Sequence, residues 1–200
     1  MLFVFVGAEI SQRSIDDIEK KYGIFAANRF RYYNKLLRSC RDKNSSFILK
    51  SVNDFWNIMK YKSDLKIWKK KDYWATPYEM LLAGAGDCED YVIAKYYTLR
   101  KLGIDPVKLY FVFAKIKNQK RTHMVLAYCP SVFDEPVILD NINNHILAVS
   151  KRKDLTPIYY FNSKILMRFW KYKEKKRIEA KKIKLKWKSL KRRVIINPLQ

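Results

Sequence analysis

The chain has 200 residues, of which 48% are hydrophobic and 15% aromatic, enough for the core of one domain with an extension. Lys and Arg number 42 against 19 Asp and Glu, so the formal net charge of +23 favours an acidic partner. No segment approaches the about 20 consecutive apolar residues of a membrane-spanning helix, and three cysteines cannot all pair within the chain. Composition therefore excludes a helical membrane span and a fully paired set of intramolecular disulfides.

The first eight residues form a short apolar segment that ends in small residues. Leu2 to Val6 is apolar, and Gly7 and Ala8 follow it, as at the cleavage end of a secretory signal peptide. The apolar run is shorter than that of a complete signal peptide, and no basic region precedes it. We interpret residues 1–8 as the remnant of a signal peptide, with an ordinary N-terminal strand as the alternative.

Helices are predicted ahead of the first chemically distinctive stretch. Apolar residues recur at helical spacing from Ser14 to Arg38, with Gly23 as a break that divides this region in two. An aromatic-rich helix follows from Phe47 to Met59. Asp72 to Glu79 is extended or turn-like, because the residue before Pro77 avoids helical dihedrals and the proline ring suits the first turn of a new helix. We interpret these helices as structural support.

A lone cysteine follows two glycines in the stretch Gly84 to Tyr91, which reads Gly-Ala-Gly-Asp-Cys-Glu-Asp-Tyr. Helical spacing continues from there until Gly103, so Cys88 falls in the first turn of a helix. Unpaired backbone N–H groups and the positive end of the helix dipole favour a thiolate at that position. The glycines allow a sharp turn that leaves the sulfur uncovered. This stretch predicts a reactive thiol.

The same residues also suit a purely structural start of a helix. Asp87 is a natural N-cap, and Asp90 can reach back to it as in a capping box. Cysteine is among the most buried residue types, so a packed and unreactive Cys88 is the alternative. A disulfide between Cys40 and Cys129 would still leave Cys88 free, so the cysteine count does not assign a compartment.

Two predicted strands supply a base and a carboxylate for such a nucleophile. One of the two histidines, His123, lies in the alternating run Thr122 to Tyr128, and Val137 to Asp140 is a second strand. Because the first residue of one strand in an antiparallel ladder lies opposite the last residue of the next, Asp140 should lie beside His123. A Cys-His-Asp arrangement is typical of acyl-transfer sites. Taken singly, a strand-end histidine and a strand-terminating aspartate are common structural features.

A third strand is predicted from Leu109 to Lys117. At least three antiparallel strands then pack on the helix that carries Cys88, which makes the fold class α+β. Ile146 to Asp154 and Pro157 to Phe161 are candidates for edge strands.

The C-terminal part holds much of the basic excess. From Lys164 to Arg193 the chain has fifteen Lys or Arg against two acids, so the body alone is moderately basic. Apolar residues such as Trp187 and Leu190 alternate with these cations, which predicts a basic helix that binds an anionic membrane surface or a partner through residues 164–193. Nucleic-acid binding rests on charge alone and is less favoured. A solvated tail is the remaining alternative.

Several blocks of the sequence resemble a known family. The blocks are Asp72 to Glu79 (Asp-Tyr-Trp-Ala-Thr-Pro-Tyr-Glu), Gly86 to Tyr91 (Gly-Asp-Cys-Glu-Asp-Tyr), His123 to Tyr128 (His-Met-Val-Leu-Ala-Tyr) and Leu139 to Asn141 (Leu-Asp-Asn). In residue type and order they resemble the bacterial transglutaminase-like cysteine proteinases, whose best-known members are the periplasmic LapG-type proteases. The resemblance covers Tyr22 to Asn162.

The resemblance implies a papain-like, transglutaminase-type fold for residues 9–163, followed by a basic helical extension over residues 164–200. It implies that Cys88 is the nucleophile, His123 the base and Asp140 the residue that orients the base. It also implies Ca²⁺ bound by the acidic residues that flank the nucleophile, namely Asp87, Glu89 and Asp90. Carboxylate oxygens suit Ca²⁺, although three acids fall short of its six to eight ligands.

LapG-type enzymes cut the N-terminal region of large repeat-containing surface adhesins and thereby release biofilm. The resemblance therefore implies a periplasmic enzyme with such an adhesin as substrate, and an inner-membrane receptor for cyclic di-GMP as inhibitor. Transglutaminases and arylamine acetyltransferases use the same triad for transfer rather than hydrolysis, so an acyltransferase is an alternative. A non-catalytic module that binds a partner or a membrane through the basic tail is another.

Overall fold

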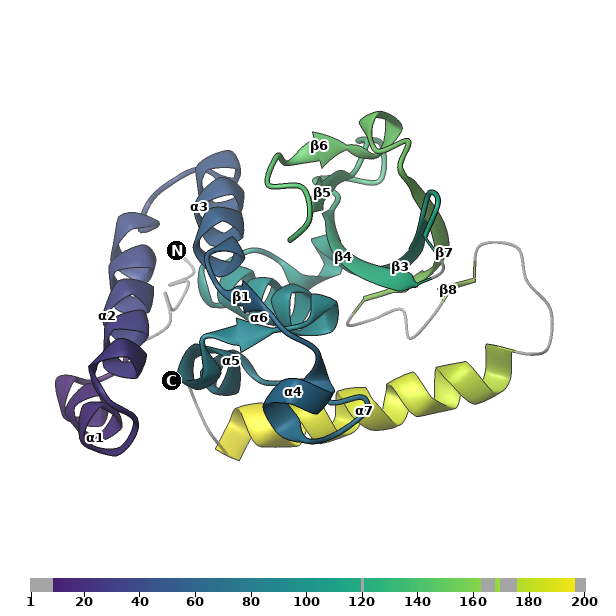
Figure 1. Cartoon of the computed structure of the whole chain (residues 1–200). Coiled ribbons are helices and arrows are strands. Elements are labelled where there is room, and N and C mark those ends of the chain that lie inside the picture. Colours follow the sequence, from purple (N-terminus) through teal and green to yellow (C-terminus); the bar gives the residue numbers. More distant parts are fainter. Residues whose placement is uncertain (1–8, 120, 163–167, 170–175, 197–200) are drawn as a thin grey trace.

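The computed structural model describes residues 9–119, 121–162, 168–169 and 176–196 (Figure 1). The interpretation of residues 1–8, and the part of the predicted basic helix at 164–167 and 170–175, lie outside these residues. Within the same predicted helix, Arg168–Phe169 form a strand instead, because they pair with Tyr159 and Tyr160. The α-helices are α1 (Gln12–Tyr22), α2 (Ile24–Ser39), α3 (Ser45–Asn57), α4 (Asp64–Trp68), α5 (Pro77–Ala83), α6 (Cys88–Lys101) and α7 (Lys176–Ile196), with 3-10 turns η1 (Pro106–Lys108) and η2 (Val149–Lys151). The strands are β1 (Lys60–Tyr61), β2 (Ala85–Gly86), β3 (Leu109–Ile116), β4 (Thr122–Tyr128), β5 (Val137–Leu139), β6 (Leu147–Ala148), β7 (Leu155–Phe161) and β8 (Arg168–Phe169).

The main sheet is antiparallel, with strand order β6-β5-β4-β3-β7-β8. Its centre confirms the predicted pairing, since Leu109 of β3 lies opposite Tyr128 of β4, and Leu126 of β4 opposite Leu139 of β5. The region Ile146–Asp154 contributes β6 and η2. The prediction of an edge strand at Pro157–Phe161 was wrong, because β7 lies between β3 and β8.

Helix α6 lies at the centre of the domain, between α3 and α5 on one side and β4 on the other (Figure 1). Its buried side chains point in every direction, and they include Tyr91, Ile93, Tyr96 and Leu99. A helix that is covered all round is a core element rather than a surface helix. Cys88, its first residue, is therefore held by the most enclosed part of the fold.

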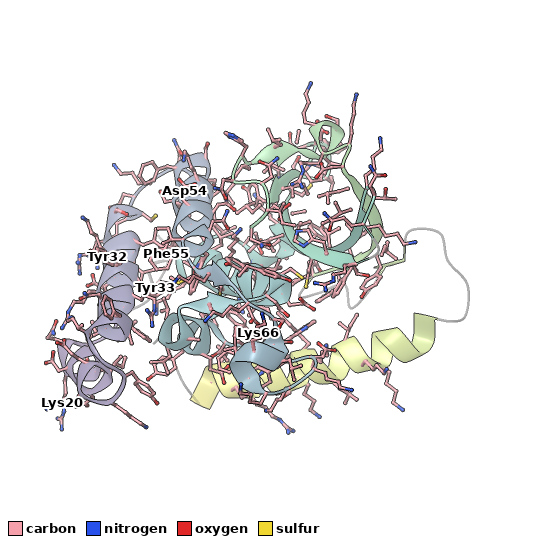
Figure 2. The ribbon with its side chains drawn as sticks, viewed as in Figure 1. Lys20, Tyr32, Tyr33, Asp54, Phe55 and Lys66 are labelled. Atoms are coloured by element: carbon pink, nitrogen blue, oxygen red, sulfur yellow. The ribbon has the colours of Figure 1, made fainter. Side chains whose placement is uncertain are left out.

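The N-terminal helices form a layer that supports α6. The rings of Tyr33 on α2 and Phe55 on α3 pack at a tilt of 56° with 5.7 Å between centroids, whereas labelled residues such as Lys20 and Lys66 are exposed (Figure 2). Trp56 of α3 donates through its indole N–H to Thr98 of α6 at 3.0 Å. These contacts hold α6 on the side that faces the N-terminal helices, as predicted for supporting helices.

Helix α7 packs along the body below α4 and α5 (Figure 1). Ile183 and Leu190 are buried, and the Trp187 ring lies 5.0 Å from that of Phe111 and 5.6 Å from that of Tyr96, centroid to centroid. A solvated tail is therefore wrong for residues 176–196. Within the described part of the chain, no helix is both long and apolar enough to cross a membrane.

Candidate active site

The nucleophile loop depends on two glycines with different constraints. Gly84 ends α5 with φ of 62°, a left-handed conformation that favours glycine. Gly86 is constrained by space, because a Cβ there would lie 2.8 Å from the Cβ of Asp90. The strand that contains Gly86 pairs in parallel with β1 opposite Tyr61, so the loop is clamped immediately before Cys88.

Cys88 is half-buried and faces the strand that carries His123. The backbone N–H of Met124, the residue after His123, is near enough to the Cys88 sulfur to work against the rise of its pKa. The thiol itself donates to Oε2 of Glu89 at 2.8 Å. All three cysteines are free thiols, and Cys40 is buried in the helical layer. The structure thus brings the thiol to the start of β4, as the sequence predicted.

His123 and Asp140 form a buried pair on the sheet. Nε2 of His123 lies 2.7 Å from Oδ1 of Asp140, which follows directly after β5. The predicted register was wrong, because the ladder pairs Leu139 with Leu126 and Asp140 is therefore not opposite His123. The two residues are offset along the sheet and meet through their side chains. With Nε2 used by the carboxylate, Nδ1 is the imidazole nitrogen left for chemistry.

Arg152 completes this pair from η2. Its Nη2 donates to Oδ2 of Asp140 at 2.7 Å, and Asp154 pairs with the same guanidinium. Burial by itself would raise the pKa of Asp140, but hydrogen bonds from His123, the Ile142 N–H and Arg152 outweigh it and lower this pKa to about 2. Asp140 is therefore a stable carboxylate in a site where its negative charge is fully paired.

A buried lysine lies behind the same carboxylate. Nζ of Lys95, on α6, donates to Oδ1 of Asn53 at 2.7 Å, and Asn53 in turn donates to the carbonyl of Asn144 at 3.0 Å. Burial lowers the pKa of Lys95 to about 7, against the opposing influence of the Asp140 and Asp54 charges. This lysine links α6 to the turn that follows Asp140.

Three aspartates gather on the other side of Cys88. Oxygen atoms of Asp64, Asp87 and Asp90, which we call the acidic cluster, lie within 4.8 Å of one another. Oδ1 of Asp64 and Oδ1 of Asp87 are buried without a hydrogen-bond partner. Buried polar atoms are normally paired, so two unpaired carboxylate oxygens on neighbouring aspartates of one cluster indicate a ligand. The donor set consists of hard oxygens and fits a divalent cation such as Ca²⁺.

The proton affinities reflect this concentration of negative charge. Burial, followed by the charges of Glu89, Asp90 and Asp64, raises the pKa of Asp87 to about 10. Burial also dominates the rise of the Asp90 pKa to about 8. The pKa of the Cys88 thiol is raised by burial and then by Glu89, which opposes the lowering expected from the helix N-terminus. In this form of the protein, burial and carboxylates outweigh the helix dipole.

The predicted metal ligands are distributed over two overlapping groups. Asp87 and Asp90 belong to the acidic cluster, whereas Glu89 groups with Asp87 and the Cys88 sulfur. Asp90 also accepts from the Asp87 N–H at 3.3 Å, as the capping-box prediction requires. Sequence reasoning missed Asp64, which starts α4 far from the cysteine in the chain, and it missed Arg152, for which no motif gives a signal.

The comparisons with known proteins agree with this geometry. The family description for the bacterial transglutaminase-like cysteine proteinases (BTLCP) matches residues 34–164. The chain belongs to this family. It is therefore a cysteine proteinase by descent, and its helix-plus-sheet architecture is the one that the family predicts. A search of the curated proteins gives no match.

Solved structures of LapG from Legionella pneumophila share the fold. The calcium-bound form is 34% identical, with a TM-score of 0.71 over 83% of this chain and 91% of that chain. An EGTA-treated form is 32% identical, with a TM-score of 0.75 over 94% of this chain and 99% of that chain. At this identity and coverage, nearly the whole chain corresponds to LapG.

Proposed function

We propose that this BTLCP member is a calcium-dependent cysteine endopeptidase in which Cys88 is the nucleophile, His123 the base and Asp140 the residue that orients the base. The observation that carries the proposal is the buried His123–Asp140 pair, whose histidine lies on β4, the strand packed against the helix that starts at Cys88. A nucleophile, a base and an orienting carboxylate in sequence are what thiol-based acyl transfer needs.

The protein's own groups account for each step of peptide hydrolysis. Nδ1 of His123 takes the thiol proton of Cys88, because Nε2 is held by Asp140. The thiolate attacks the scissile carbonyl carbon, and the Cys88 backbone N–H at the start of α6 donates to the developing oxyanion. The protonated imidazole then gives its proton to the leaving amine. Water, deprotonated by His123, hydrolyses the resulting thioester and releases the thiol.

The acidic cluster, with Glu89 beside it, would hold the calcium ion. Bound Ca²⁺ supplies positive charge and an electrophilic centre among carboxylates that otherwise repel one another. The similarity to LapG structures in calcium-bound and EGTA-treated forms supports this choice of ion. Backbone carbonyls and water have to complete the shell, since these residues provide fewer than six to eight ligands.

The same similarity supports a biological role for the reaction. The proposed substrate is the N-terminal region of a large repeat-containing surface adhesin, cut in the periplasm so that biofilm is released. An inner-membrane receptor for cyclic di-GMP is the proposed inhibitor. The exposed lysines on the outer side of α7, such as Lys184 and Lys188, favour attachment to an anionic membrane surface over binding to nucleic acid.

The test is cleavage of a recombinant N-terminal fragment of such an adhesin by the purified chain. We expect two fragments with wild type and with the matched control Cys129→Ala, and none with Cys88→Ala. EGTA should stop cleavage, and excess Ca²⁺ but not Mg²⁺ should restore it. Cross-linked product in place of fragments would support an acyltransferase, and full activity of Cys88→Ala would overturn the assigned nucleophile.

A further inference from the structure

Arg193, near the end of α7, joins the C-terminal helix to the segment between α4 and α5. Its Nη1 donates to the Tyr73 hydroxyl at 2.6 Å and to Oε2 of Glu79 at 2.7 Å, and its Nη2 donates to the Trp74 carbonyl. The guanidinium also lies over the Tyr73 ring, 4.4 Å from the centroid. Arginine is suited to this role because its planar fork can bind several acceptors at once.

A second cation of α7 holds the same segment two helical turns earlier. Lys186 forms an ion pair with Asp72, and its ammonium lies 5.3 Å from the centroid of the Trp74 ring. Between these two residues, Leu190 is fully buried in the core. Helix α7 therefore contacts the segment Asp72–Trp74 at both ends, and its own apolar side is packed into the core.

The backbone of this segment orients two of the three aspartates in the acidic cluster. The Tyr73 N–H donates to Oδ2 of Asp64 at 2.6 Å, and the Ala75 N–H donates to Oδ1 of Asp90 at 2.7 Å. Each bond uses one oxygen of its carboxylate, and in Asp64 the other oxygen, Oδ1, is buried without a hydrogen-bond partner. The segment thus holds like charges close together against their mutual repulsion.

We propose that Arg193 is a positioning residue for the cation site, and that α7 is a brace which presets the acidic cluster for its ion. This inference rests on the proposed calcium site. Arg193 acts through Tyr73, Trp74 and Glu79, since within the described part of the chain its hydrogen bonds go to these residues and not to the three aspartates. Without the brace, the two backbone donors lose their fixed direction and the aspartates move apart before an ion binds.

The test is isothermal titration of the intact chain with CaCl₂ after treatment with EGTA and its removal. Arg193→Gln should bind Ca²⁺ about 10- to 100-fold more weakly, the usual effect of removing an outer partner of metal ligands. Arg192→Gln is the matched control, because it removes the same charge from an exposed neighbouring position. It should bind as wild type does. Arg193→Lys should recover only part of the affinity, since an ammonium cannot reproduce the fork.

Two further measurements separate positioning from stability alone. Tyr73→Phe removes the hydroxyl that bonds to both Arg193 and Glu79 but keeps the backbone N–H that donates to Asp64. It should therefore weaken Ca²⁺ binding, but less than Arg193→Gln does. If Arg193→Gln fails to fold, a weaker affinity of Tyr73→Phe than of wild type still tests the proposal. Urea unfolding in EGTA reports stability without the ion. Lower stability with unchanged affinity in both variants would overturn the brace, whereas absence of Ca²⁺ binding by wild type would overturn the proposed site itself.

Discussion

The two sides of Cys88 differ in how the negative charge of their carboxylates is balanced. On the sheet side, Asp140 has each oxygen paired, one with His123 and one with Arg152. On the other side, the acidic cluster collects aspartates with orphaned oxygens and raised pKa values. On the sheet side, which we call the completed side, the protein's own groups balance the charge of Asp140. The charges of the acidic cluster are balanced only when a cation binds there. In the proposed mechanism, the fold alone orients the base, and activity depends on a bound cation.

The largest expected effect comes from removing the base on the completed side. His123→Ala should lower kcat/KM for the adhesin fragment by at least about 10⁴-fold, and the double variant with Cys88→Ala should lose nothing more, because members of such a unit act together. Steady-state cleavage assays on folded proteins measure this. Independent, multiplying losses in the two single variants would show that the residues do not work as a pair.

Removing the buried guanidinium of Arg152 should lower the stability of the fold. Arg152→Met leaves Oδ2 of Asp140 buried without its charged partner, so the free energy of unfolding should fall by about 3–5 kcal/mol. Lys151→Met, at the exposed neighbouring position, serves as the control in urea denaturation. Equal stability of the two variants would mean that Arg152 is dispensable for holding the carboxylate.

Lys95 gives the completed side a pH dependence with a definite sign. Its pKa is about 7 in the folded chain and near 10.5 when unfolded, so between these values the unfolded state binds more protons and folding stability rises with pH. Relative to Lys95→Met, wild type should gain up to about 1.4 kcal/mol per pH unit across this window. Below pH 7 both states are protonated, and the difference should level off. Urea unfolding of both proteins at pH 6, 7, 8 and 9 tests it; a constant difference would contradict the buried, weakly basic lysine.

The smallest expected effect is a change in stability whose sign depends on whether Ca²⁺ is bound. Asp64→Asn removes one repelling charge but keeps an acceptor for the Tyr73 N–H, so in EGTA it should stabilise the fold by roughly 1 kcal/mol. In Ca²⁺ the same change removes a ligand and should destabilise the protein relative to wild type. Thermal unfolding under both conditions measures the two shifts. Shifts of the same sign would place Asp64 outside the cation site.

The sequence predicted the His123–Asp140 pair of the completed side, although not Arg152, because local rules determine that pair. Alternation defined β4 exactly over Thr122–Tyr128 in the structure, and antiparallel neighbours brought Asp140 to His123. The glycines and Asp87 placed Cys88 at the first position of α6. These features depend on residues adjacent in the chain or on adjacent strands, where periodicity and turn chemistry are informative.

The remaining features depend on contacts between distant segments. Asp64 joins the cluster through the chain that follows α3, and nothing in its surroundings distinguishes it from a helix-capping acid. The charge of α7 predicted a surface helix, but Trp187 and Leu190 pack into the core and Arg193 reaches a segment 120 residues away. Helical spacing and the N-cap correctly predicted a helix start at Cys88. The lower thiol pKa expected from the helix dipole was wrong, because burial and Glu89 raise it.

The enclosure of α6 has a consequence for the order in which parts of the molecule open. Its amides are covered by helices on one side and by β4 on the other, so their hydrogen exchange should require unfolding of the whole domain. The segment at Asp72–Ala75 has no regular secondary structure and is secured largely by side chains, so its amides should exchange through a smaller, local opening. A cation at the proposed site can then enter and leave through local opening of this segment, while Cys88 stays in place on the helix that we expect to exchange most slowly.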